Sequence, residues 1–322
     1  MDDTRILITS VGRRGQLVRW FKTQVNINTR VFAVDASATA PGAYLADEWT
    51  LVSRIDSPTY IDELLELCRT KAITLVVPTI DTELGLLAAH KHKFSEMGSM
   101  VAVSDSETIE VTMNKKLSHD WLNAKGFPVP QQRVLLRGES WPSALELPSF
   151  IKPLTGSRSI GAKRISIRED IPIGKAQDDY CIEEFVDGDE FTVSVYMDQL
   201  GKCLASVPRQ RLEVRDGEVS KALTRDIPEI EELARSVAES LPGAWGPLNI
   251  QIIRDPHTGQ MWVIEINARF GGGDPLAWHA GANMPEWLIS EALGREPIIR
   301  ERWKSNVAML RFDEAIFLPW SH

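Results

Sequence analysis

The sequence is poor in cysteine, and Cys68, Cys181 and Cys203 are the only three in 322 residues. Their odd number and wide separation exclude a disulfide framework and the paired spacing of a structural zinc site. No run of about 18 apolar residues occurs, so the sequence predicts no membrane-spanning helix. The first three residues are neither cationic nor apolar enough to open a secretory signal. These absences lead us to expect a cytoplasmic protein.

Positive charge is also in short supply. The 36 lysines and arginines are outnumbered by 45 aspartates and glutamates, which gives a formal net charge of −9. An acidic chain without a basic block lacks the patch that holds nucleic-acid phosphates or anionic lipids. We therefore expect neither nucleic acid nor a membrane as a partner. Hydrophobic residues at 43% and charged residues at 25% are globular proportions, and the length suits two or three packed units.

The first hundred residues alternate between two kinds of pattern. Short apolar strands are predicted at 5–10, 31–35, 75–78 and 100–103, with amphipathic helical stripes between them. Short apolar strands that alternate with helices are typical of a parallel sheet covered on both faces. We therefore expect an α/β unit with a doubly wound parallel sheet.

The pattern then changes. One helix is predicted over 108–125, and an extended segment follows at Phe127–Pro130, because each proline pushes its predecessor out of the helical region. Most segments from 131 to 225 read as strands, and a helix over 229–241 and a hairpin come next. An α+β unit is thus expected after a boundary near 108–130.

The predicted hairpin carries polar residues on one face. Its strands are 248–253 and 261–267, and alternate residues of a strand share a face. We expect Trp262, Ile264 and Ile266 on the apolar face, and Gln251, Glu265 and Asn267 on the opposite one. Three oxygen-bearing side chains followed by Arg269 suit a hard cation and an anion, and magnesium takes such ligands. From spacing alone, an ordinary solvated sheet face is the alternative.

Two glycine-containing turns are candidate anion sites. Gly156–Gly161 has the spacing of a P-loop but lacks the lysine and hydroxyl residue that should follow, and strands flank it on both sides. Such a loop can still cover phosphates with its amides, helped by Lys152, although a flexible hairpin tip is the alternative. Gly12–Gly15 is not a dinucleotide fingerprint, but a helix N-terminus there can hold an anion. No serine or cysteine motif indicates nucleophilic catalysis.

Several motifs combine into one pattern. They are Met113-Asn114-Lys115, Phe150-Ile151-Lys152-Pro153, the stretch 182–190, Pro208–Arg211 and the hairpin set. Together they resemble the ATP-grasp superfamily, above all the synthetase units of the carbamoyl-phosphate synthetase large chain and related carboxylate–amine ligases. Asn114 stands where the family usually has aspartate. The resemblance runs from the N-terminus to about residue 295 and implies a pre-ATP-grasp domain at 1–108. An ATP-grasp fold of two α+β lobes would follow at 109–322, with a lid lobe at about 130–184 and a catalytic lobe at about 185–295.

The resemblance also implies roles for individual residues. ATP binding falls to Lys115, Lys152, Gly156, Ser157, Ser159, Gly161, Glu183, Glu184, Phe185, Val186 and Glu190. The metal set is Gln251, Glu265 and Asn267, and the catalytic cations are Arg209, Arg211 and Arg269. Substrate contacts are expected from Gly12, Arg13, Asp81, Glu83, Gly272 and Asp274.

The activity implied by the resemblance is that of an ATP-dependent carboxylate–amine ligase, which works through an acyl phosphate and releases ADP and phosphate. Its cofactors are ATP and magnesium, with manganese as the other metal considered. Its partners are a small acid and an amino acid or amine, and a homodimer is compatible with the family. The alternative is a non-catalytic ATP-binding or regulatory subunit on the same fold.

Overall fold

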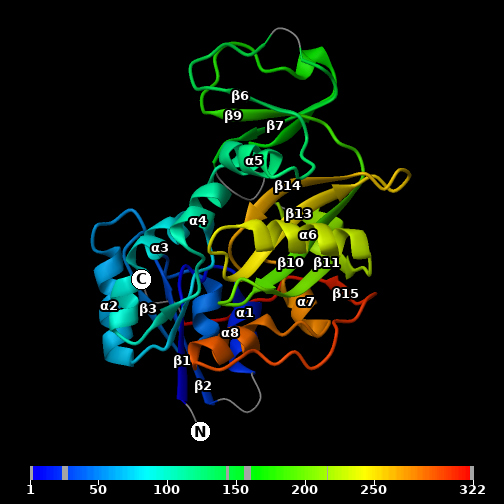
Figure 1. The fold of residues 1–322 in the computed structure, drawn as a ribbon. Helices are drawn as coiled ribbons and strands as arrows, with labels where there is room; N and C mark the ends of the chain where they lie inside the picture. The colour runs from blue at the N-terminus through cyan, green and yellow to red at the C-terminus, as the bar shows by residue number, and fades with distance from the viewer. Residues whose placement is uncertain (1–2, 24–27, 143–144, 156–160, 216, 320–322) are drawn as a thin grey trace.

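The computed structural model describes residues 3–23, 28–142, 145–155, 161–215 and 217–319. Three sheets succeed one another along the chain and occupy different parts of the molecule (Figure 1). The first lies at the bottom left of the view, the smallest at the top, and the six-stranded sheet between them. No helix in the described ranges is long and apolar enough to cross a membrane.

The first sheet is parallel and has the strand order β3-β2-β1-β4-β5. Its strands are β1 (Asp3–Ile8), β2 (Asn28–Asp35), β3 (Glu48–Leu51), β4 (Leu75–Val77) and β5 (Met100–Val101). Its helices are α1 (Gly15–Lys22), α2 (Tyr60–Lys71), α3 (Asp81–Glu96) and α4 (Ser106–Met113), and the 3-10 turn η1 covers Pro41–Leu45. Leu7 of β1 packs with Leu64 of α2, whereas Ile6 packs with Leu17 of α1. Because successive side chains of β1 enter different cores, both faces are covered, and the predicted doubly wound sheet is confirmed.

The six-stranded sheet is antiparallel, in the order β14-β13-β10-β11-β12-β15. Its strands are β10 (Asp189–Met197), β11 (Cys203–Arg215), β12 (Glu218–Thr224), β13 (Gly246–Arg254), β14 (Met261–Asn267) and β15 (Ala308–Leu310). Helix α6 (Pro228–Ser240) packs on one face through Ile230, Ala234 and Val237, all fully buried. The opposite face therefore remains available to line a cavity. Two short helices follow, α7 (Pro275–His279) and α8 (Met284–Ala292).

The small sheet has the order β6-β9-β7-β8 and is also antiparallel. Its strands are β6 (Gln132–Leu135), β7 (Ser149–Pro153), β8 (Lys163–Ile165) and β9 (Tyr180–Glu184), and a 3-10 turn, η2, covers Arg168–Asp170. Ile151, Ile165 and Ile182 form its own small core. Helix α5 (Lys115–Ala124) lies between this sheet and the six-stranded one (Figure 1).

The single helix predicted over 108–125 is two helices, because Asn114 interrupts it. Asn114 has an extended backbone (φ −126°, ψ 121°) and ends α4. Its side-chain oxygen accepts from the amides of Lys116 at 2.9 Å and Leu117 at 3.2 Å, so it caps α5. The cap makes Lys115 the first residue of α5.

The face predicted for the second hairpin strand is wrong in part, because β14 contains a bulge. Gln251 pairs with Glu265, but the next residue, Ile252, pairs with Val263, so Ile264 is an extra residue. Val263 and Ile266 are each 1% exposed in the core, whereas Ile264 lines the cavity beside Glu265. The bulge thus moves Ile264 from the core to the site, and the prediction for Trp262 is also wrong, since Trp262 pairs with Ile253 on the face of Gln251 and is not in the core.

Candidate active site

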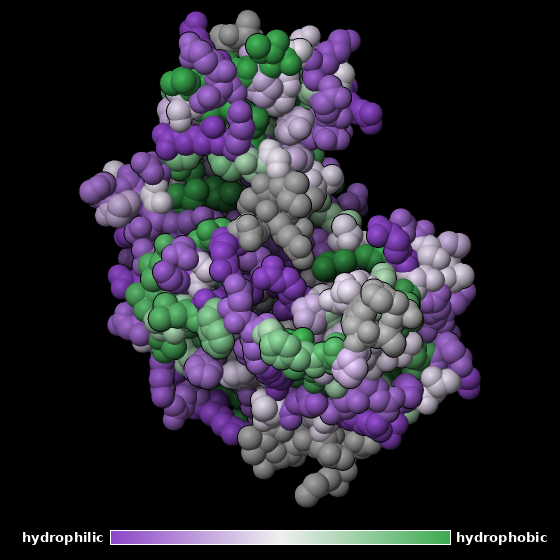
Figure 2. Space-filling view, turned by 180° about the vertical axis from the view of Figure 1, so that it is seen from behind, coloured by the Kyte–Doolittle hydropathy of each residue, from purple (hydrophilic) through white to green (hydrophobic). Residues whose placement is uncertain are grey.

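A cavity of about 540 Å³ lies between the small sheet and the uncovered face of the six-stranded sheet. Figure 2 shows a hollow between the upper part and the body of the molecule, with hydrophilic residues around it. We call it the main cavity. It is lined from β7, β9, β10, β11, β13 and β14, from the first residue of α5 and from the start of α3.

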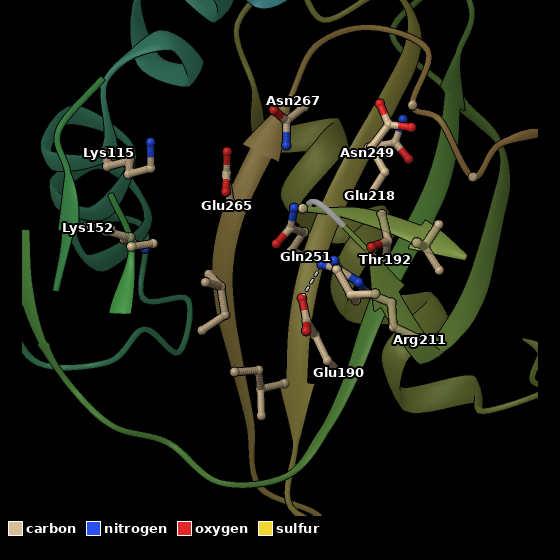
Figure 3. Close-up of a pocket in the computed structure, with 18 of the residues that line it drawn as sticks. Lys115, Lys152, Glu190, Thr192, Arg211, Glu218, Asn249, Gln251, Glu265 and Asn267 are labelled. Carbon is tan, nitrogen blue, oxygen red and sulfur yellow. Dashed lines mark hydrogen bonds and ion pairs between the residues drawn. The ribbon is translucent and has the colours of Figure 1, made fainter. Parts of the chain in front are cut away.

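Two lysines face the cavity from the side of the small sheet. Lys115 begins α5, and its amide donates to the carbonyl of Leu154 at 3.1 Å. Lys152 lies on β7, is 5% exposed, and has its Nζ 2.9 Å from Oε2 of Glu183 on β9. Both lysines lie across the cavity from Glu265 (Figure 3). The cavity therefore contains a buried cation with an internal counter-ion.

Oxygen-bearing side chains form rows across the six-stranded sheet. Glu265 on β14 pairs with Gln251 on β13, which pairs with Thr192 on β10. Asn267 pairs with Asn249 in the next row of the same face (Figure 3). Cross-strand neighbours have Cβ atoms about 4.5–5.5 Å apart, so these side chains are within reach of one ion.

The fit to a metal follows from the chemistry of these donors. Gln251, Glu265 and Asn267 supply one carboxylate and two amide oxygens, all lining the cavity. A hard cation such as magnesium takes oxygen donors and keeps positions for water or phosphate oxygens. Nowhere in the described ranges do three or more His, Cys, Asp or Glu side chains gather to hold a metal. Because Gln251, Glu265 and Asn267 offer oxygens and neither a thiolate nor an imidazole, the set suits magnesium better than zinc.

Arg209 is held in a buried network at the edge of the cavity. It is 2% exposed, and its Nη2 donates to Oδ1 of Asn249 at 2.6 Å and to Oδ1 of Asp274 at 2.9 Å. Asp274 is fully buried and also accepts from the Ser194 hydroxyl at 2.7 Å and the Gly271 amide at 2.6 Å. Burial lowers the pKa of Arg209, and the charge of Asp274 opposes that shift. Arg209 is thus fixed in place by neighbours from three other segments.

The other two predicted catalytic arginines are also paired. Arg211 donates through Nη1 to Glu190 (Figure 3), and Arg269 donates through Nη2 to Oδ2 of Asp81 at 2.5 Å. Asp81 is the first residue of α3, so this contact joins the first sheet's unit to the end of β14. With Lys152–Glu183 and Arg14–Glu218, four cation–carboxylate pairs have both partners in the wall of the main cavity.

The stretch predicted to bind adenine lies along the cavity wall. Glu183, Glu184, Phe185 and Val186 all line it. The Glu184 carboxylate accepts from the Gln131 amide at 3.0 Å, and the Phe185 amide donates to the carbonyl of Pro148 at 3.2 Å. The structure therefore brings these four residues together with Glu190, and Phe185 has its amide engaged by the chain itself.

Some predicted residues are not in the main cavity. Glu83 is fully buried, accepts from the Tyr60 hydroxyl at 2.8 Å and the Thr79 amide at 3.0 Å, and has its pKa raised by burial. It caps α3 internally, so the prediction that it contacts substrate is not supported by its position. The amide of Gly12 donates to Asp35 at 2.8 Å, and Gly12 does not line the main cavity.

Others lie beside it or outside the described residues. Arg13 lines a neighbouring cavity, and Asp274 lies behind the glycine loop that lines the main one. Asp81 and Gly272 do line the main cavity. Gly161 follows the undescribed segment and has φ +76°, a value that favours glycine. The predicted residues Gly156, Ser157 and Ser159 fall outside the described residues.

Thr192 and Glu218 are polar residues of the cavity wall that sequence reasoning did not single out. Strand alternation places Asn249 on the same face as Gln251, and Asn249 does line the cavity. Glu218 begins β12, a strand with no clear sequence pattern. Arg14 lies at the N-terminus of α1, and only the tertiary fold brings it beside Glu218, with 3.7 Å between Nη1 and Oε1.

Two family models match the chain. Residues 6–102 match the PylC-like N-terminal domain, and residues 176–314 match the ATP-grasp model described as belonging to a biosynthetic pathway with the Ter operon. The 3-methyl-D-ornithine–L-lysine ligase of Methanosarcina barkeri is 29% identical over 267 residues, which is 81% of this chain and 66% of that protein. The alignment thus covers just under two thirds of that relative's length.

Solved structures share the fold. The L-amino acid ligase of Bacillus licheniformis has a TM-score of 0.65 at 16% identity, over 90% of this chain and 74% of its own. The biotin carboxylase domain of Hydrogenobacter thermophilus 2-oxoglutarate carboxylase was solved with MgADP. It has a TM-score of 0.69 at 17% identity, and the match covers 95% of this chain and 73% of that chain. These likenesses cover the first sheet as well as the two sheets that enclose the main cavity. The predicted resemblance to the ATP-grasp superfamily is thereby confirmed, because residues 176–314 match an ATP-grasp family model and the chain shares its fold with these ligase and carboxylase structures.

Proposed function

We propose that the protein is an ATP-dependent ligase that joins a carboxylate to an amine through an acyl phosphate. The observation that carries this proposal is the convergence on one cavity of three groups of residues. Lys115 and Lys152 face it from one side, Glu265 with its amide neighbours faces it from the other, and Arg269 also lines it. Cations around an oxygen-donor set are what phosphoryl transfer requires.

The nucleotide is placed by the residues of the small sheet and β10. The wall at Glu183–Val186 takes the adenine, Glu190 takes the ribose hydroxyls, and Lys115 and Lys152 take the phosphates. Lys152 exchanges its contact with Glu183 for a phosphate oxygen, so the buried cation stays paired. Gln251, Glu265 and Asn267 hold magnesium, which supplies charge neutralisation at the phosphates when bound.

The chemistry has two steps. A carboxylate oxygen of the acid attacks the γ-phosphorus of ATP, the bond from that phosphorus to the β-bridging oxygen breaks, and ADP leaves. The amine nitrogen then attacks the acyl carbon, the carbon–oxygen bond to the phosphate breaks, and phosphate leaves while the amine proton passes to solvent. Arg209, Arg211 and Arg269 stabilise the negative charge that moves between these oxygens. Neither step needs a side-chain nucleophile.

The names of the relatives support the ligase class. The Methanosarcina barkeri relative and the Bacillus licheniformis structure are both ligases that are named for amino acids. We therefore include amino acids among the acids and amines of the proposal. The domain borders at 108/109, the lobe borders, the use of manganese and a homodimer stay predictions.

The test is a screen of acids against amines with ATP and magnesium, followed by measurement of ADP and phosphate. We expect at least one pair to release ADP and phosphate in equal amounts and to give an amide by mass spectrometry. Glu265→Gln keeps the side-chain volume but removes the carboxylate, and it should lower turnover by at least about 100-fold. Glu296→Gln, at an exposed position outside the cavity, is the matched control.

Two results would contradict the proposal. Release of AMP and pyrophosphate indicates adenylation rather than phosphorylation of the acid. The second result is a wild-type protein that turns over no acid–amine pair, together with a Glu265→Gln variant that binds ATP with unchanged affinity. This result favours the alternative of a non-catalytic ATP-binding subunit.

A further inference from the structure

A second cavity of about 540 Å³ adjoins the main cavity, where α1, α7 and β15 converge (Figure 1). We call it the side pocket. It shares with the main cavity a wall made by Arg14, Glu218, Val219, Gly271 and Gly272. A molecule bound in the side pocket can therefore present one end to the site of phosphoryl transfer.

One end of the side pocket suits an anion. The pocket is lined by Gly15, Gln16 and Leu17, the first three residues of α1. This helix has no side-chain cap and no acidic residue in its first turn, so nothing in its own sequence offsets the positive N-terminal end. Arg13 also lines the pocket, is exposed, and has no ion pair within the described ranges.

A buried donor also lies in the pocket wall. Trp278 of α7 is 3% exposed, lines the side pocket, and has an indole N–H without a hydrogen-bond partner among the residues that the structure describes. A buried donor that lacks a partner costs about 1–3 kcal/mol, so such groups are normally satisfied. A ligand oxygen in the side pocket would supply the partner.

The middle of the side pocket is apolar. Leu17, Phe270 and Leu276 are each at most 3% exposed and line it, and Met309 of β15 closes it from the other side. Aliphatic and aromatic side chains of this kind bury an apolar body but give no partner to a charge. The pocket is therefore polar at the α1 end and apolar beyond.

We propose that the side pocket binds the amine substrate, and that this substrate is an amino acid with an apolar side chain. Its carboxylate lies at the N-terminus of α1 beside Arg13, and its side chain lies against Leu17 and Phe270. Its amino group points across the shared wall, where Glu218 supplies a carboxylate. This assignment rests on the proposed ligase function, and it makes the product an amide with an unmodified carboxylate.

Direct binding tests the assignment without turnover. Isothermal titration of the full chain with ADP and magnesium present compares leucine and phenylalanine with leucinamide and phenylalaninamide, and with phenyl phosphate as a second anion. We expect at least one amino acid to bind and its amide to bind about ten-fold or more weakly, because a charge-assisted hydrogen bond contributes about 1.5–3 kcal/mol. Tighter binding of phenyl phosphate than of either amino acid would overturn the carboxylate assignment.

Two variants separate binding from folding. Gln16→Glu places a negative charge in the first turn of α1, which favours the helix but repels a carboxylate, so it should abolish amino-acid binding without loss of thermal stability. Arg13→Gln should weaken binding of the amino acid and leave the affinity for its amide unchanged. Arg54→Gln is the matched control, since Arg54 is exposed and lies outside the pocket.

The outcomes distinguish this assignment from the ligase proposal. The side-pocket assignment is overturned if an amino acid and its amide bind equally well, if neither amino acid binds, or if Gln16→Glu binds amino acids as tightly as the wild type. If acid–amine pairs still release ADP in that case, the ligase proposal stands. If amino acids bind as expected but no pair releases ADP, the assignment of the pocket stands and the ligase proposal fails.

Discussion

Replacing Asp274 by asparagine should destabilise the fold far more than its small change in volume suggests. The carboxylate is fully buried and accepts four hydrogen bonds, two on each oxygen. Oδ1 takes Ser194 and Arg209, and Oδ2 takes Asn249 at 3.0 Å and Gly271 at 2.6 Å. In asparagine an NH2 group replaces one of these oxygens. Whichever way the amide turns, two of the four hydrogen-bond donors then face this NH2 group, which cannot accept from them.

The larger loss is the charge. Arg209 is 2% exposed, and Asp274 is the carboxylate bonded to it. Removing one partner of a buried ion pair leaves an uncompensated charge and costs about 3–5 kcal/mol. Ser194→Ala is the matched control, because it removes one neutral donor to the same carboxylate and should cost about 1 kcal/mol.

Urea unfolding followed by tryptophan fluorescence gives the free energy of unfolding for both variants. A double variant that adds Arg209→Gln should recover part of the loss, because no buried charge then lacks its partner. The reasoning is refuted if Asp274→Asn costs no more than Ser194→Ala, or if the losses of the two single variants add in the double variant.

Three further predictions concern single groups. Asn114→Ala removes the cap of α5 and should lower the free energy of unfolding by about 1 kcal/mol in a urea titration. Burial raises the pKa of Cys68 to about 11 and those of Cys181 and Cys203 to about 12, so a thiol reagent should label none of them at pH 7 until urea is added. Burial also raises the pKa of Glu83 above the ordinary value of 4.5, so the folded state binds its proton more tightly than the unfolded state. The contribution of this proton to the free energy of unfolding is fully present below pH 4.5 and is lost as the pH rises through the pKa of Glu83 in the folded state. Glu83→Gln should not show this loss when the free energy of unfolding is measured from pH 4 upward.

Much of the site could be predicted from the sequence where local patterns determine it. The two-residue period of β13 and β14 identified Gln251, Glu265 and Asn267 before any contact was known, because strand alternation needs no tertiary information. The same period could not reveal the bulge at Ile264. Trp262, Ile264 and Ile266 alternate regularly in the sequence, and the extra residue becomes visible only in the pairing with β13. Asn114 was read as helical because a cap is decided by backbone geometry and not by residue type alone.

Long-range contacts set the limit of sequence reasoning. Asp274 follows three glycines beyond the strand of the predicted metal ligands, and it was predicted to contact substrate. Its partner Ser194 lies 80 residues away in the sequence, and only the folded sheet reveals that the carboxylate is buried. The strand β15 has three residues, two of them exposed, so no pattern in the last residues indicated that it pairs with β12.

The pairing of cations in the main cavity determines which form of a polyphosphate can enter it. Lys152, Arg211 and Arg269 each have a carboxylate partner, and Glu265 adds a further negative group to the cavity wall. Seven carboxylates and six cationic side chains line the cavity, so the described wall has no excess of positive charge to offset the full charge of a metal-free polyphosphate. A polyphosphate already complexed with a divalent cation carries less charge and brings a partner for Glu265. We therefore expect the cavity to favour the complexed form, so that nucleotide affinity rises steeply with the concentration of the divalent ion.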